Sequence, residues 1–288
     1  MWKYLAYTRP WSIPFTFVLV LTGYLLAPLR PAWPACGRDL VFLLVVYSVL
    51  GWGGTNAFNS AEDRDEGPVN LLPAPPPRPA HLGAFGMAWG ALSIVVTIAW
   101  PGRLRVLPLV ALAAALSLAY SYRGAPFRRL KEIGIVDNVT NALGCGPIAI
   151  AIGWGVAAPF DLRLLPIAAG FFLAFFGGYT TTQIFQLRDD DTYATARNYT
   201  SLLGAPLALR LSAVAFLAHV VVLLAVLRAR ALSSVAYGAW IALVLLAALH
   251  AWRWARVPRD APQRRMLIQL SLMMGSQVCF LIGDALCR

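Results

Sequence analysis

The residues best suited to chemistry form an oxygen-rich group at the end of an otherwise apolar run. At the 3.6-residue repeat of an α-helix, Asn56, Asn59 and Asp63 share one face, and Glu66 continues it. Amide and carboxylate oxygens are the ligands that Mg²⁺ prefers, and bound Mg²⁺ attracts phosphate groups. The spacing therefore predicts that this helix face binds a hard cation such as Mg²⁺ and, through it, a phosphate group.

This pattern occurs twice in the chain. The amide-x-Phe-amide-x-x-x-Asp arrangement of residues 56–63 returns at 183–190, each time after a Gly-Gly pair. Such a repeat suggests a pseudo-symmetric bundle in which two similar helix ends meet across a central cavity. We therefore expect substrate-binding roles for Asn56, Gln183 and Gln186, and metal binding by Asp190 or Asp191.

The elements that position these residues are predicted membrane spans. The 288 residues are 59% hydrophobic and only 13% charged, which is far from the composition of a soluble domain. Nine apolar runs approach the roughly 20 residues that cross a bilayer. We expect an all-α, polytopic membrane protein with one domain, 1–288, and spans at 11–29, 40–60, 81–100, 104–121, 135–157, 164–186, 207–227, 233–252 and 266–286.

The charge pattern favours a membrane role over nucleic-acid binding. The formal charge is +11, but the basic residues are spread among short loops and form no stripe interleaved with aromatic residues. Most of the 24 Lys and Arg residues fall in alternate loops, which places the amino terminus and both acidic clusters in the cytoplasm. We expect a multi-pass protein of a bacterial inner membrane, with its cavity open to the cytoplasmic side.

The loop after the fourth run supplies cations. Within residues 122–131 lie Arg123, Arg128, Arg129 and Lys131. Beside magnesium ligands, such cations suit an anion such as a diphosphate. We predict that Arg128 and Lys131 bind substrate, whereas positive-inside anchoring is a sufficient explanation for the other two.

Polar residues near this loop give further candidates. Asp137, Asn138 and Asn141 begin the fifth run, where they would line the cavity, although Asp137 fits a helix cap nearly as well. Tyr122, in the same loop, offers an aromatic face that can contact a cation. Tyr122 and Asn141 are therefore included among the predicted substrate-binding residues.

Together these segments resemble the UbiA superfamily of intramembrane prenyltransferases, which includes the 4-hydroxybenzoate polyprenyltransferases. Residues 9–14 resemble its RPxxxP segment, and 59–67 its first acidic motif, NDxxDxxxD. Residues 122–131 resemble the YSxPPxRxK loop, and 186–191 the second acidic motif, DxxxD, followed by a similar segment at 196–204. The resemblance covers essentially the whole chain.

The match has three departures. Ser60 and Gly67 stand where the first motif has aspartates, and Gln186 replaces the first aspartate of the second motif. Asp65 or Glu66 would then substitute in the first motif, so the metal ligands that the resemblance implies there are Asn59, Asp63, Asp65 and Glu66. Oxygen donors remain at both motifs, so the metal-binding chemistry is retained.

The resemblance implies magnesium-dependent transfer of an isoprenyl group from an isoprenyl diphosphate to a small, aromatic acceptor within the membrane. It implies catalytic roles for Asp63, Asp190 and Asp191, with Asp191 accepting the proton that the acceptor loses. One alternative is a terpene synthase of the same superfamily, which would cyclise the cation without a separate acceptor. A transporter is less favoured, because the acids gather at one face, and the DGxxAR signature of CDP-alcohol phosphotransferases is absent. The oligomeric state is left open.

Overall fold

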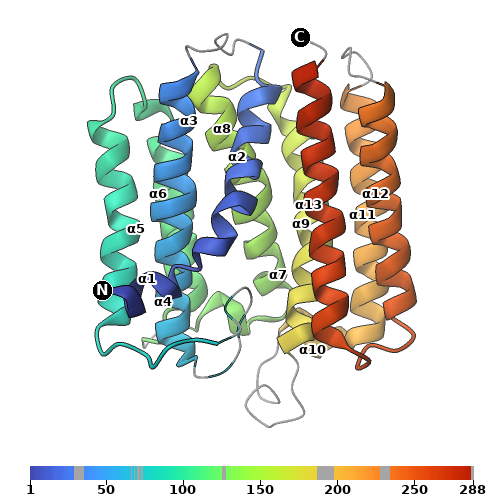
Figure 1. Cartoon of the computed structure of the whole chain (residues 1–288), viewed down its shortest axis with the longest axis horizontal. Helices are drawn as coiled ribbons and strands as arrows, with labels where there is room; N and C mark the ends of the chain where they lie inside the picture. Colours follow the sequence, from blue (N-terminus) through green and yellow to red (C-terminus); the bar gives the residue numbers. More distant parts are fainter. Residues whose placement is uncertain are drawn as a thin grey trace. The chain divides into compact units, whose positions relative to one another are not determined.

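A computed structural model describes residues 1–28, 36–65, 67, 69, 72, 74–124, 128–186, 198–227 and 234–286, without the side chains of 185, 186, 227, 234 and 283–286. This part of the chain is helical, with two isolated β-bridges and no strand. It forms two compact units (Figure 1). Unit 1 comprises Met1–Leu130 and Ile148–Phe160, and unit 2 comprises Lys131–Pro147 and Asp161–Arg288.

The all-α membrane architecture is confirmed. Eight helical stretches in the described ranges are long and apolar enough to cross a membrane, and they correspond to the second through ninth predicted runs. They are Gly37–Asp63, Leu82–Ala99, Leu104–Ser121, Gly134–Ala157, Leu164–Ile184, Ala205–Val226, Val235–Trp254 and Pro262–Ile282.

The first predicted run does not form a comparable span, so the count of nine is not confirmed. Its helix, α2 (Ile13–Leu26), has 14 residues, which corresponds to a length of about 21 Å at 1.5 Å per residue. The preceding turn is the short 3₁₀ helix η1 (Pro10–Ser12). At the other end, Ala27 is extended, as expected for a residue before a proline, here Pro28.

Unit 1 is built from pairs of closely packed helices. α2 packs against α8 (Ala149–Ala157), and α4 (Gly53–Asp63) against α5 (Leu82–Ala99). α4 continues α3 (Gly37–Leu43) and the π-helical stretch η2 (Leu44–Trp52), while α6 (Leu107–Ser121) follows the 3₁₀ turn η3 (Leu104–Val106). The short α1 (Trp2–Tyr7) also contacts α4.

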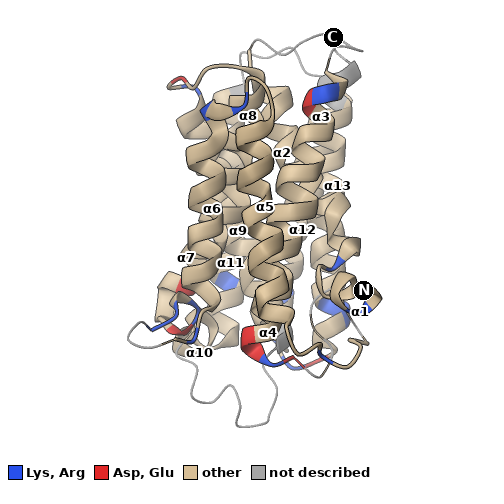
Figure 2. Ribbon diagram, turned by 90° about the vertical axis from the view of Figure 1, so that its left-hand side faces the viewer, with Lys and Arg blue, Asp and Glu red and all other residues tan. Residues whose placement is uncertain are grey.

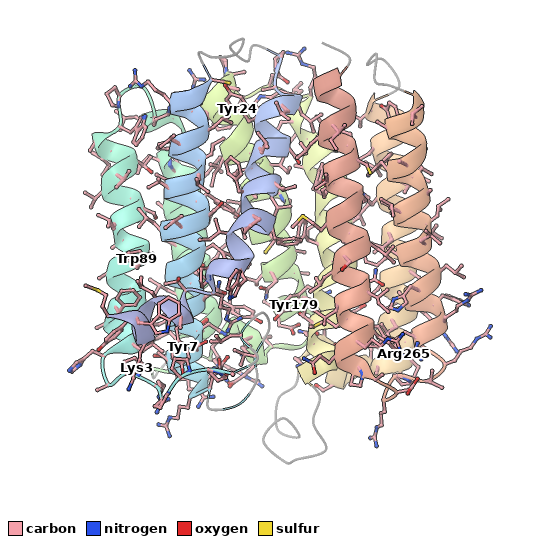
Figure 3. All side chains as sticks on the ribbon, in the orientation of Figure 1. Lys3, Tyr7, Tyr24, Trp89, Tyr179 and Arg265 are labelled. Atoms are coloured by element: carbon pink, nitrogen blue, oxygen red, sulfur yellow. The ribbon has the colours of Figure 1, made fainter. Side chains whose placement is uncertain are left out.

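A buried polar group ties together one end of unit 1. Asp39, in the first turn of α3, forms an ion pair with Arg103 and accepts a hydrogen bond from the Tyr24 hydroxyl at 3.1 Å. Arg103 also donates to the Val156 carbonyl at 3.1 Å. Figure 3 places Tyr24 near one end of α2 and Tyr7 near the opposite end of the unit. Asp39 is in the first turn of α3, and α4 is the other end of the same helical stretch, so this polar group lies away from the acidic end of α4.

The described part of unit 2 contains four long α-helices and two short ones. α9 (Leu164–Gln186) packs against α11 (Ala205–Leu227), and α11 against α12 (Ser234–Trp254), which pairs with α13 (Pro262–Leu286). α7 (Gly134–Leu143) and α10 (Tyr199–Leu203) pack against each other and against α9. The π-helical η5 (Gly144–Ile148) connects α7 to α8.

Charge and apolar surface are distributed as a membrane requires. Among the described residues, Lys, Arg, Asp and Glu lie at or near helix ends and in loops (Figure 2). Large apolar side chains are exposed along the helices between those ends, among them Val95, Leu112, Val221 and Leu246. An exposed apolar surface of this extent suits contact with lipid.

Candidate active site

The first acidic motif lies at the end of α4, which tight helix packing holds against α5. A Cβ on Gly54 would lie 2.6 Å from the Gly90 amide nitrogen, and one on Gly86 would lie 2.5 Å from the Phe58 amide nitrogen. Only glycine allows the two backbones to approach so closely. Gly54, the second residue of the Gly-Gly pair, and Gly86 therefore set where α4 lies on its neighbour.

α4 ends three residues earlier than the predicted helical face. Its last residue is Asp63, and Arg64 takes a left-handed conformation with φ 56°. Asn56, Asn59 and Asp63 lie on the helix as predicted, but the expected continuation of the helix to Glu66 is wrong. Asp65 follows the turn, and Glu66 lies outside the described residues.

Each oxygen-bearing side chain near this end contacts the rest of unit 1. Asp63 pairs with Arg129 at 2.7 Å, and the two side chains are only 9% and 8% exposed. The Asn59 Oδ1 atom accepts a hydrogen bond from the Ser121 hydroxyl at 3.0 Å. Glu62 accepts from the Arg123 backbone amide at 2.9 Å. The end of α4 is thus attached to the end of α6 and to the loop after it.

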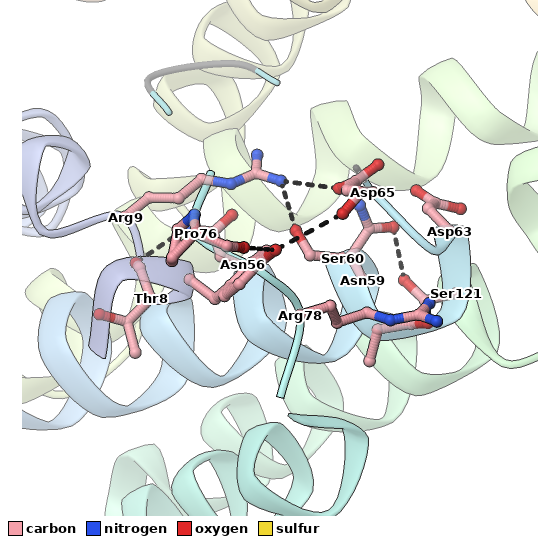
Figure 4. Close-up of polar contacts among 12 residues, drawn as sticks. Thr8, Arg9, Asn56, Asn59, Ser60, Asp63, Asp65, Pro76, Arg78 and Ser121 are labelled. Atoms are coloured by element: carbon pink, nitrogen blue, oxygen red, sulfur yellow. Dashed lines mark hydrogen bonds and ion pairs between the residues drawn. The ribbon is translucent and has the colours of Figure 1, made fainter. Parts of the chain in front are cut away.

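Arg9 approaches the same motif from the amino-terminal segment (Figure 4). Its Nη2 atom donates to the Ser60 hydroxyl at 3.0 Å and lies 3.7 Å from the Asp65 carboxylate. Arg9 is buried and has φ 53°, a conformation that costs a non-glycine residue about 1 kcal/mol or more. Ser60, which stands at an aspartate position of the family motif, is therefore a direct contact of Arg9.

The loop cations differ in their placement. Arg129, which positive-inside anchoring is sufficient to explain in the sequence, pairs with Asp63 of the acidic motif. Arg128 is exposed and Lys131 is half-buried, while Tyr122 is 50% exposed. Because residues 128 and 129 are both arginine, the sequence does not indicate which of the two side chains turns inward.

The second motif is described only up to the end of α9. Gln183 is buried and bonded to Asp137 and Thr200. The Gln186 side chain, Asp190 and Asp191 lie outside the described residues. Two amides predicted to bind substrate also hold the fold together, since Asn56 donates to the Thr8 carbonyl at 3.3 Å and Asn141 to the Asp137 carbonyl at 3.0 Å.

The donors at the end of α4 are chemically suited to Mg²⁺. Asn59 supplies an amide oxygen, while Asp63 and Asp65 supply carboxylates, and hard divalent cations bind such oxygen ligands. In the described ranges, no three His, Cys, Asp or Glu side chains come together as a metal-binding group. At a magnesium site here, the α4 residues would therefore make up only part of the coordination sphere, and other oxygen donors would have to complete it.

Comparisons with known proteins identify the fold. The model of the UbiA prenyltransferase family matches residues 16–273. A UbiA homolog from Archaeoglobus fulgidus bound to DMAPP and Mg²⁺ superposes with a TM-score of 0.66 at 17% identity, covering 96% of this chain and 98% of that one. The same homolog bound to GPP and Mg²⁺ gives 0.64 at 16% identity, with coverages of 96% and 99%.

A digeranylgeranylglyceryl phosphate synthase also has this fold, with a TM-score of 0.66 at 12% identity and coverages of 98% and 97%. No curated protein sequence matches the chain. At these identities the structural likeness defines the fold, while the family model spans most of the sequence. This chain belongs to the UbiA prenyltransferase family.

Proposed function

We propose that the protein transfers an isoprenyl group from an isoprenyl diphosphate to a small, aromatic acceptor within the membrane, using Mg²⁺. Family membership supports a prenyltransferase, and structural neighbours bound to DMAPP or GPP with Mg²⁺ support this donor and this metal. Residues 1–288 would act as one functional domain. The positive-inside distribution of Lys and Arg supports a cytoplasmic amino terminus and active site.

The observation that carries this proposal is the buried pair of Asp63 and Arg129 beside Asn59. A metal-bound diphosphate needs oxygen ligands for its cation and positive charge for its own oxygens, and this helix end offers both. Bound Mg²⁺ would supply charge that neutralises the diphosphate as it leaves. The proposed metal ligands are Asn59, Asp63, Asp65, Glu66, Asp190 and Asp191.

The protein's own cations would act during cleavage of the allylic C–O bond. Negative charge grows on the diphosphate as this bond breaks, so Arg129, Arg128 and Lys131 would stabilise the transition state more than the ground state. Asp191 would then accept the proton lost by the acceptor. The apolar helices would hold the prenyl tail and keep water from the cation. The other proposed substrate-binding residues are Asn56, Tyr122, Asn141 and Gln186, whereas both polar atoms of the Gln183 amide are bonded to Asp137 and Thr200.

The test is an assay of purified protein in lipid nanodiscs with isoprenyl diphosphates of several chain lengths. Diphosphate release and product mass are measured with and without Mg²⁺ and with and without aromatic acceptors. We expect release that requires Mg²⁺ and a product whose mass is the sum of prenyl group and acceptor. Hydrocarbon products formed without acceptor would indicate a cyclase instead, and no release with any donor would refute the proposal.

A further inference from the structure

A carboxylate in unit 2 joins three separate elements. Asp137, in the first turn of α7, is fully buried. Its Oδ1 atom accepts hydrogen bonds from the backbone amides of Asn138, at 2.6 Å, and of Tyr199, at 3.1 Å. Its Oδ2 atom accepts from the Gln183 side chain. A buried carboxylate is tolerated only when it is bonded in this way, so these contacts hold α7, α9 and α10 together.

Gln183 extends this network to α10. Its Oε1 atom accepts a hydrogen bond from the Thr200 hydroxyl at 2.6 Å, and Thr200 is fully buried. The backbone adds a parallel bridge between Gly134 and Asn198. The last turn of α9 and the first turn of α10 are therefore both attached to the start of α7.

These two attachment points lie on either side of the second acidic motif. α9 ends at Gln186, α10 begins at Tyr199, and residues 189–191 of the intervening sequence are all aspartate. Fixing both ends of a connection restricts the positions that the residues within it can reach. Asp137, which lies on α7, is thus bonded both to the helix before the motif and to the helix after it.

We propose that Asp137, Gln183 and Thr200 form a clamp that positions the second acidic motif, with Asp137 as a positioning residue at its centre. The catalytic consequence rests on the proposed function, whereas the clamp itself does not. Asp137 bonds to other residues of the protein through both carboxylate oxygens, so its role is to hold the chain and not to contact substrate.

Two substitutions break the clamp in different ways. Asp137→Leu removes both acceptors, which leaves the Tyr199 amide and the Gln183 side chain without their partner. Thr200→Val removes one hydroxyl and keeps the side-chain shape. Asp137→Asn is the conservative variant, because its oxygen still accepts from Tyr199 and a turned Gln183 amide can accept from its nitrogen. Thr140→Val is the matched control, since the Thr140 hydroxyl bonds the Val136 carbonyl of its own helix.

Limited trypsin digestion tests the clamp independently of the protein's own catalytic activity. Trypsin cleaves after Arg188 and Arg197, which lie between the two attachment points, and mass spectrometry gives each rate relative to cleavage after the exposed Arg256. We expect cleavage about tenfold faster in Asp137→Leu and several-fold faster in Thr200→Val. Asp137→Asn and Thr140→Val should stay within about twofold of the wild type.

Wild-type cleavage rates in both Asp137→Leu and Thr200→Val would overturn the proposal. If Asp137→Leu does not fold, Thr200→Val decides alone against Thr140→Val, and equal rates in these two would also overturn it. The positioning role is tested by the Mg²⁺ concentration that half-saturates diphosphate release, which should rise in Thr200→Val and not in Thr140→Val. An unchanged value would refute the positioning role. Absence of release in the wild type would refute the proposed function and leave the trypsin result valid.

Discussion

The pairing of Asp63 with Arg129 can be measured with a double-mutant cycle. The variants are Asp63→Asn, Arg129→Met and the two combined, and the quantity is the free energy of unfolding in detergent. Both side chains are less than 10% exposed and their charged atoms are 2.7 Å apart. Removing one partner of such a buried pair typically costs about 3–5 kcal/mol, because a charge is left in an apolar environment. The double variant leaves neither charge, so its loss should be well below the sum of the two.

We therefore expect a coupling energy of about 2 kcal/mol or more between positions 63 and 129. Asp260 and Arg265 form a matched control at 2.6 Å, but the Asp260 side chain is 65% exposed. Water screens such a pair, and its coupling energy should be below about 1 kcal/mol. Equal coupling energies for the two pairs would refute the reasoning, since burial would then contribute nothing to the first pair.

Further predictions concern helix packing, the distant polar group and the metal. Gly86→Ala should destabilise the protein by about 1–3 kcal/mol, because its Cβ would meet the backbone of α4, whereas Gly90→Ala, with nothing within 4 Å, should change stability by less than about 1 kcal/mol. Equal losses in the two would contradict the close-packing explanation. Arg103→Met should lower the free energy of unfolding by about 3 kcal/mol by leaving Asp39 without its ion pair. It should leave the half-saturating Mg²⁺ concentration unchanged, and a shift there would show that this group affects the active site. Removing divalent cations with EDTA should stop diphosphate release, and adding back Mg²⁺ should restore it; full release in EDTA would exclude the proposed metal dependence.

Hydropathy predicted most of the helices well because membrane spans must be both long and apolar. The run predicted at 164–186 has the same limits as α9. The first run differs for a local reason. Ala27 precedes a proline, which ends α2 before the apolar composition changes.

The site was less predictable, because its details depend on tertiary contacts. α4 ends at Asp63 because Arg64 takes a left-handed backbone conformation. That position is usually a glycine, so the sequence does not indicate the end of the helix. The inward orientation of Arg129, and not Arg128, depends on its tertiary contact with Asp63. The contact of Arg9 with Ser60 joins segments 51 residues apart, and the clamp around Asp137 requires α7, α9 and α10 to be packed together.

The proposed activity requires that the end of α4 bind a metal-bound isoprenyl diphosphate. The most direct test is the Mg²⁺-dependent rate of diphosphate release by Asp63→Asn, compared with the wild type and with Asp260→Asn, at a temperature where circular dichroism shows all three folded. We predict that Asp63→Asn lowers the rate by at least about a hundredfold, while Asp260→Asn retains the wild-type rate. A wild-type rate and Mg²⁺ dependence in Asp63→Asn would contradict this binding role for the end of α4.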